Sequence, residues 1–178
     1  MKEDSIFHTR KNAEGYLWNT PRLFPKADRI WGSPYAPGEL ATDELIARWN
    51  TGEFVGIQFT IGEINAYNVA GTSMYIWNDM YKVINRCNEM LSKIKDVPGM
   101  NNSQRAEYVG YVHFMRAYAY YHLLQNWGPL LIVGDDVIDA TKTAEYFNKS
   151  RSTYDESVDY IVNEFELAAK SIPTQKRM

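Results

Sequence analysis

The aromatic-rich segment at residues 111–129 constrains the fold of this chain more than any other part of the sequence. Apolar residues recur there at i, i+3, i+7 and i+10, the spacing of one helical face: Phe114, Ala117, Tyr121 and Leu124. The remaining helix surface is also largely apolar, at Tyr111, Met115, Tyr118 and Leu123. We therefore expect a helix that is packed on more than one side. Gly128 and Pro129 predict its sharp end, and no catalytic grouping lies within it.

Helical periodicity predicts three long helices. The first covers about 73–95 and ends at Pro98-Gly99, and the second covers about 103–126. The third begins at Thr153, which can form a capping box with Glu156, and ends before Pro173. A weaker helix is expected near 9–18, and a further one could begin near Asp43.

The loops between these helices complete an all-α fold class. Residues 19–40 hold four prolines and two glycines, so we expect no regular structure there. The pattern favours a tetratricopeptide-like helical-hairpin scaffold at 73–173, preceded by a loop-rich N-terminal region at 1–72. No clean repeat of fixed period is present, so any repeats would be irregular.

Composition excludes several classes of protein. The 178 residues are 45% hydrophobic and 23% charged, as in a globular chain. A net charge of -3 gives no reason to expect a nucleic-acid partner. Residues 1–5 lack the apolar run of a signal peptide. Aromatic residues are 14% of the chain, and exposed Tyr and Trp rings suit sugar-binding surfaces as well as cores.

No metal or cofactor site is predicted. His113 and His122 lie about 180° apart around one helix, so they cannot share a metal ion. The acidic residues Asp135, Asp136 and Asp139 lack the alternating oxygen ligands and central Gly of a calcium loop, and a solvated turn is expected. Cys87 cannot form an intrachain disulfide, because it is the single cysteine, and we expect a buried, inert thiol.

Buried side chains can be assigned from the same rhythm. Arg116 lies among apolar neighbours, so we expect it to be buried and paired with a carboxylate or with carbonyl groups, with ligand contact as the alternative. We also expect the three helices to pack as antiparallel hairpins. Their predicted shared core consists of Trp77, Tyr81, Phe114, Tyr118, Tyr121, Ile161 and Phe165.

Three sequence segments resemble the SusD/RagB family of outer-membrane glycan-binding lipoproteins. The hallmark runs from Phe114-Met115-Arg116-Ala117 through Leu123 to Trp127-Gly128-Pro129-Leu130. The resemblance continues through Arg151-Ser152-Thr153 to Ile172-Pro173, and includes Trp77, Tyr81, Ile84, Asn88 and Leu91 upstream. Two local departures are visible: the family commonly has Glu at the place of Tyr111, and more residues between Gly128 and Pro129.

Family members are much longer, so the resemblance implies that residues 1–178 form a single N-terminal helical domain of a longer chain. It further implies a surface-exposed lipoprotein of the outer membrane, whose signal peptide and lipidated cysteine are not in this chain. The implied role is non-catalytic: binding an oligosaccharide or polysaccharide and delivering it to a TonB-dependent, SusC-like transporter.

The candidate ligand-binding residues lie in loops before the predicted helix at 73–95. They are Trp31, Tyr35, Asp43, Arg48, Trp49 and Asn50. An aromatic ring beside amide and guanidinium donors suits a pyranose, and binding residues concentrate on loops. The alternative is that Trp49 packs against a helix end.

Two other functions remain open. The first is a tetratricopeptide-like protein-interaction module without a glycan role. The second is a glycoside-processing enzyme, although no facing pair of carboxylates is evident. Because the second helix is apolar on nearly every side, we also expect an apolar face larger than a monomer normally exposes. The remainder of a longer chain, or another copy, would cover it.

Overall fold

The computed structural model describes residues 6–26, 41–43, 55–72, 75–139 and 141–174. Every regular element within these residues is a helix, which confirms the all-α fold class. The α-helices are α1 (Arg10–Asn19), α2 (Val55–Thr60), α3 (Trp77–Lys93), α4 (Asn102–Trp127), α5 (Ala144–Phe147) and α6 (Tyr154–Ser171). Short 3₁₀ helices are η2 (Thr20–Leu23), η4 (Val69–Gly71) and η5 (Ile94–Asp96). The tetratricopeptide-like arrangement stays a prediction.

The chain divides into two compact units. Met1–Arg22 and Met80–Met178 form one, here called the helical unit, and Leu23–Asp79 form the other, here called the inserted unit. The helical unit contains α1, α4, α5, α6 and most of α3, and the inserted unit contains α2 and η4. The proposed single domain, with its boundary between 72 and 73, stays a prediction.

Local sequence signals determine where the long helices begin and end. The side chain of Thr153 accepts a hydrogen bond from the Glu156 N–H, and the Glu156 side chain accepts one from the Thr153 N–H. This is the predicted capping box. Asn101 and Gln104 form an equivalent box at the start of α4. At its end, Gly128 has φ = 70°, a conformation that side chains with a Cβ rarely adopt, and its N–H bonds the Leu124 carbonyl.

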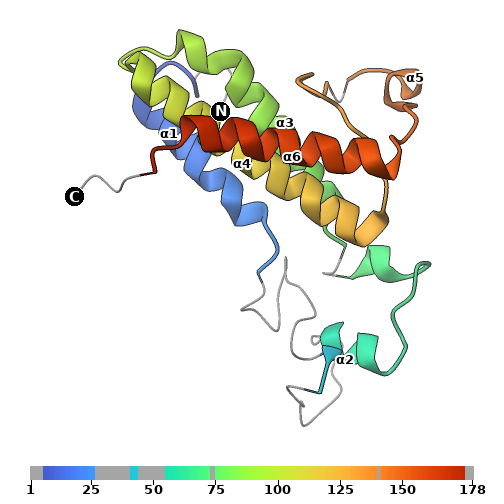
Figure 1. Cartoon of the computed structure of the whole chain (residues 1–178). Coiled ribbons are helices and arrows are strands. Elements are labelled where there is room, and N and C mark those ends of the chain that lie inside the picture. Colours follow the sequence, from blue (N-terminus) through green and yellow to red (C-terminus); the bar gives the residue numbers. More distant parts are fainter. Residues whose placement is uncertain (1–5, 27–40, 44–54, 73–74, 140, 175–178) are drawn as a thin grey trace. The chain divides into compact units, whose positions relative to one another are not determined.

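The helices α4 and α6 lie alongside each other (Figure 1) and run antiparallel. Their direction follows from three contacts in which one residue number rises while the other falls. These are Phe114 with Phe165, Arg116 with Glu164, and Tyr120 with Tyr160. The approach is closest at Gly110, where an added Cβ would lie 2.9 Å from Ile172 Cγ1 and from Ser171 Cβ. Gly110 is therefore required for the close packing of α4 against the end of α6.

Polar contacts join α1 to its neighbours in the helical unit. Tyr108 of α4 donates a hydrogen bond to Glu14, and Tyr16 donates one to Glu89 of α3. Arg86 of α3 donates to the Tyr16 carbonyl at 2.9 Å, while its guanidinium lies over the Tyr16 ring. The weak helix expected at 9–18 therefore has defined partners on both α3 and α4.

The core of the helical unit differs from the predicted one. Its buried residues include Met80, Val83, Ile84, Val112, Met115, Tyr120, Leu123 and Ile161. Phe114 and Tyr121 are instead 46% and 42% exposed, so their assignment to the core is wrong. Because α4 is apolar on two sides, its sequence did not indicate which side faces α3. Ile161 is buried as expected, and Trp77, Tyr81, Tyr118 and Phe165 are partly buried.

Candidate functional site

The predicted ligand-binding residues fall largely outside the described part of the chain. Asp43 is described and its side chain is exposed. Trp31, Tyr35, Arg48, Trp49 and Asn50 lie outside the described residues, as does most of the helix expected to begin near Asp43. Their grouping into a sugar platform therefore stays a prediction.

A residue that the sequence analysis did not select, Tyr67, is the most exposed large apolar side chain described. It lies in the inserted unit and is 98% exposed. Its turn is held by local hydrogen bonds: the Tyr67 N–H donates to Asn65 Oδ1 at 2.9 Å, and the Asn65 N–H donates to Asn68 Oδ1 at 2.8 Å. Asn68 Nδ2 then donates to the Glu63 carbonyl at 2.7 Å. The turn presents a flat aromatic face to solvent, with amide side chains beside it.

The sequence held a signal for this turn. Asn65 and Asn68 are turn-forming residues on both sides of Tyr67, and Gly62 precedes them with φ = 76°. An aromatic ring between turn formers is expected to project into water. The missing step was the exposure of the ring, which depends on the absence of a covering segment rather than on local sequence.

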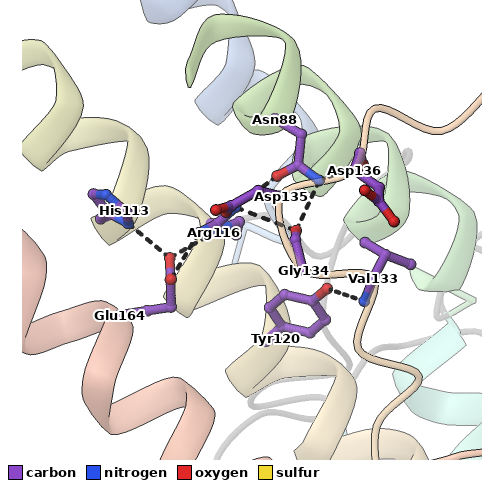
Figure 2. A network of polar contacts seen from close by, with 9 residues as sticks. All are labelled: Asn88, His113, Arg116, Tyr120, Val133, Gly134, Asp135, Asp136 and Glu164. Atoms are coloured by element: carbon purple, nitrogen blue, oxygen red, sulfur yellow. Dashed lines mark hydrogen bonds and ion pairs between the residues drawn. The ribbon is translucent and has the colours of Figure 1, made fainter. Parts of the chain in front are cut away.

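A buried polar network centred on Arg116 lies in the helical unit (Figure 2). Its guanidinium binds Glu164 in a bidentate manner, with Nε and Nη2 each 2.7 Å from a carboxylate oxygen. Nη1 donates to Asn88 Oδ1 at 2.7 Å and to Asp135 Oδ1 at 2.6 Å. Arg116 is 2% exposed. The prediction of a buried, paired arginine is confirmed.

The same network attaches the segment 130–138 to the helices. Asn88 Nδ2 donates to the carbonyls of Gly134 and Asp136, at 2.9 and 2.7 Å. The Val133 N–H donates to the Tyr120 hydroxyl at 3.1 Å (Figure 2). Side chains of α3 and α4 thereby satisfy backbone groups of a segment without regular structure.

Charge neutralisation explains how the network tolerates burial. Burial by itself would raise the pKa of Glu164, but hydrogen bonds from His113 and Arg116 outweigh it and hold that pKa below its ordinary value. Burial likewise opposes the charge of Arg116, and Glu164 reverses the effect, so the pKa of Arg116 is raised. The buried Arg116 and Glu164 therefore remain ionised, and Asp135 adds a carboxylate from the surface.

These groups are engaged with one another rather than arranged for chemistry. The donors of Arg116 face Glu164, Asn88, Asp135 and a carbonyl, which favours a structural role over ligand contact. Among the described residues, no group of three His, Cys, Asp or Glu side chains is placed to hold a metal ion. Cys87 is buried, and burial raises the pKa of its thiol to about 12, as expected for an inert cysteine.

The family model described as "Starch-binding associating with outer membrane" matches residues 31–177. The chain belongs to the SusD-like family. The match covers α2 to α6, and therefore both the Tyr67 turn and the Arg116 network of this SusD-like chain. In the part of the chain that the structure describes, no helix is both long and apolar enough to cross a membrane.

Relatives of known sequence or structure agree with this family. A SusD-like protein of Bacteroides ovatus is 20% identical over 140 residues, which are 78% of this chain and 24% of that protein. A SusD-like protein of Bacteroides fragilis has the same fold with a TM-score of 0.62 and 16% identity, over 97% of this chain and 32% of that one. A SusD-like carbohydrate binding protein of Bacteroides fragilis gives a TM-score of 0.56 at 17% identity, over 95% and 33%. This SusD-like chain thus spans about a quarter to a third of the length of these relatives.

Proposed function

We propose that this SusD-like chain is the N-terminal helical part of a non-catalytic protein that binds an oligosaccharide or polysaccharide at the cell surface. The protein would be a lipoprotein of the outer membrane that delivers its ligand to a TonB-dependent, SusC-like transporter. The observation that carries the proposal is the match of residues 31–177 to a family described as starch-binding and associating with the outer membrane. A relative of the same fold is described as carbohydrate binding.

We assign the ligand contacts of this chain to the inserted unit. Trp31, Tyr35, Asp43, Arg48, Trp49 and Asn50 all belong to it, and Tyr67 now joins them. The exposed ring of Tyr67 supports the assignment because a pyranose stacks its apolar face on such a ring. The neighbouring amides would donate hydrogen bonds to sugar hydroxyls. The described residues of the Arg116 network have no part in it.

Affinity electrophoresis against a panel of soluble polysaccharides tests this function. The 178-residue chain should be retarded by at least one of them, and Trp49→Ala and Tyr67→Ala should each weaken binding by about tenfold. Tyr154→Ala is the matched control, since Tyr154 is also exposed but lies in the helical unit. Equal loss in all three variants, or none in any, would contradict the assignment to the inserted unit.

The transporter step has its own test. A full-length relative and its outer-membrane transporter should co-purify from detergent-solubilised membranes, and the 178-residue chain alone should not suffice. The rival function, a protein-interaction module without a glycan role, would be supported if no polysaccharide bound while a polypeptide did.

A further inference from the structure

Besides its buried side, the α4–α6 pair has a second apolar side that faces outward. On α4 it is formed by residues at steps of three and four, Tyr111, Phe114, Tyr118 and Tyr121. On α6 the same spacing gives Val158, Val162, Phe165 and Ala169. We call these eight residues the outer apolar face. Its exposure is substantial: Val162 is 48% exposed, close to the values for Phe114 and Tyr121.

The two rows of this face lie in register. Phe114 contacts Phe165 edge-on, with ring centroids 5.6 Å apart. Because the helices are antiparallel, the same register places Tyr118 opposite Val162 and Tyr121 opposite Val158. Along α4, the rings of Phe114 and Tyr118 are nearly parallel, at 7°, with centroids 6.2 Å apart. Two aligned apolar rows on neighbouring helices form the shallow groove into which the side-chain ridge of a third helix fits.

The edges of the outer apolar face have a defined character. Trp18 of α1 is 52% exposed and contacts the Tyr111 ring at 5.1 Å, which extends the apolar surface at that end. On the far edge of α6, beyond Val162, the exposed side chains are Asp155, Asp159 and Glu166. Lys170 pairs with Glu166 at 3.9 Å, which leaves the edge acidic at Asp155 and Asp159.

We propose that the outer apolar face docks a further amphipathic α-helix with a basic flank, supplied by the part of a SusD-like polypeptide that this chain does not span. The relatives carry roughly two thirds or more of their length outside the share aligned with this chain. An apolar helix ridge would cover the two rows, and basic side chains on its flank would meet Asp155 and Asp159. This inference does not depend on glycan binding.

The chemistry of the face favours a helix over a sugar. Its α6 half consists of Val158, Val162, Phe165 and Ala169, none of which offers a hydrogen bond to a sugar hydroxyl. A saccharide would therefore leave hydroxyls unpaired along that half. The apolar side chains of a helix have no such requirement.

Fluorescence anisotropy on the 178-residue chain provides the test. The probe is a synthetic helical peptide with Leu and Ala on one face and Lys along one flank. It should bind the wild-type chain, and Val162→Glu should weaken binding at least about tenfold, since the new charge would be buried without a partner. Leu167→Glu is the matched control: Leu167 is 42% exposed on the opposite side of α6, so binding should be unchanged. A peptide with Glu in place of Lys should bind more weakly than the Lys peptide.

Three outcomes would overturn the proposal. Sedimentation might reveal a dimer that Val162→Glu abolishes and Leu167→Glu retains, which would assign the face to a second copy of the chain. Binding of a soluble polysaccharide lost only in Val162→Glu would assign it to a sugar. A wild-type chain that is monomeric and binds neither peptide would show that the face docks no helix.

Discussion

The two sides of α4 differ in a way that ordinary polarity does not explain. The inner side, toward α3 and α6, buries a charged residue, Arg116, next to Ala119 and Leu123. The outer side exposes aromatic rings, Phe114 and Tyr121 among them. The charged side is thus the buried one, and part of the apolar side is in contact with solvent.

The difference shows what each side requires. A buried arginine is tolerated because Glu164, Asn88 and Asp135 complete its hydrogen bonds within the helical unit. The outer aromatic rings need a covering surface that the described residues of this unit do not supply. Substitutions on the inner side should therefore change the stability of the chain, while substitutions on the outer side should change its associations.

The largest loss of stability should follow removal of the carboxylate that neutralises Arg116. Glu164→Ala leaves a buried guanidinium without its bidentate partner, and should lower the free energy of unfolding by about 3–5 kcal/mol. Glu166→Ala is the control on the same helix, because Glu166 is exposed and makes only a long surface pair with Lys170. Urea unfolding followed by circular dichroism measures both. Equal effects of the two substitutions would show that the inner network contributes no more than a surface pair.

The next largest effect concerns the contact between α4 and the end of α6. A Cβ in Gly110→Ala would lie 2.9 Å from Ile172 and Ser171, so the helices must move apart, at about 1–3 kcal/mol of stability. In Gly15→Ala of α1 the added methyl meets nothing within 4 Å. That variant should be more stable by about 0.5–1 kcal/mol, since alanine favours a helix. Melting temperatures that rise in both variants would contradict the close approach at Gly110.

Acid should weaken the inner side through Glu164. Its pKa is lowered in the folded state, where Arg116 and His113 face it, so its stabilising contribution is complete above the ordinary carboxyl pKa of 4.5. That contribution is lost as the pH falls through the lower, folded value. Between pH 7 and pH 3.5, the free energy of unfolding should fall more steeply for the wild-type chain than for Glu164→Gln. Parallel pH profiles would mean that Glu164 titrates alike in both states.

Sequence predicted the inner side better than the outer one. The capping pair Thr153–Glu156, the end of α4 at Gly128 and the burial of Arg116 follow from local rules, and the structure confirms them. The wrong assignments, Phe114 and Tyr121, lie on a helix with two apolar sides. Helical spacing identifies such sides but does not rank them, because burial depends on which partner is present. Tyr67 was missed for the same reason, since its exposure is a property of the surrounding fold.

The smallest effect on stability is expected from a neighbouring pair of α6 residues that face opposite ways. Ile161 points inward and is 6% exposed, whereas Val162 belongs to the outer apolar face. Ile161→Ala should lower the free energy of unfolding by about 2–5 kcal/mol through the cavity that it leaves. Val162→Ala should change it by no more than about 0.5 kcal/mol, because the side chain is already in contact with water. Unfolding of both variants at two protein concentrations separates the possibilities. If Val162→Ala were as damaging as Ile161→Ala at high concentration alone, copies of the chain would already cover each other's outer faces. A small, concentration-independent effect would leave the face open for a separate partner.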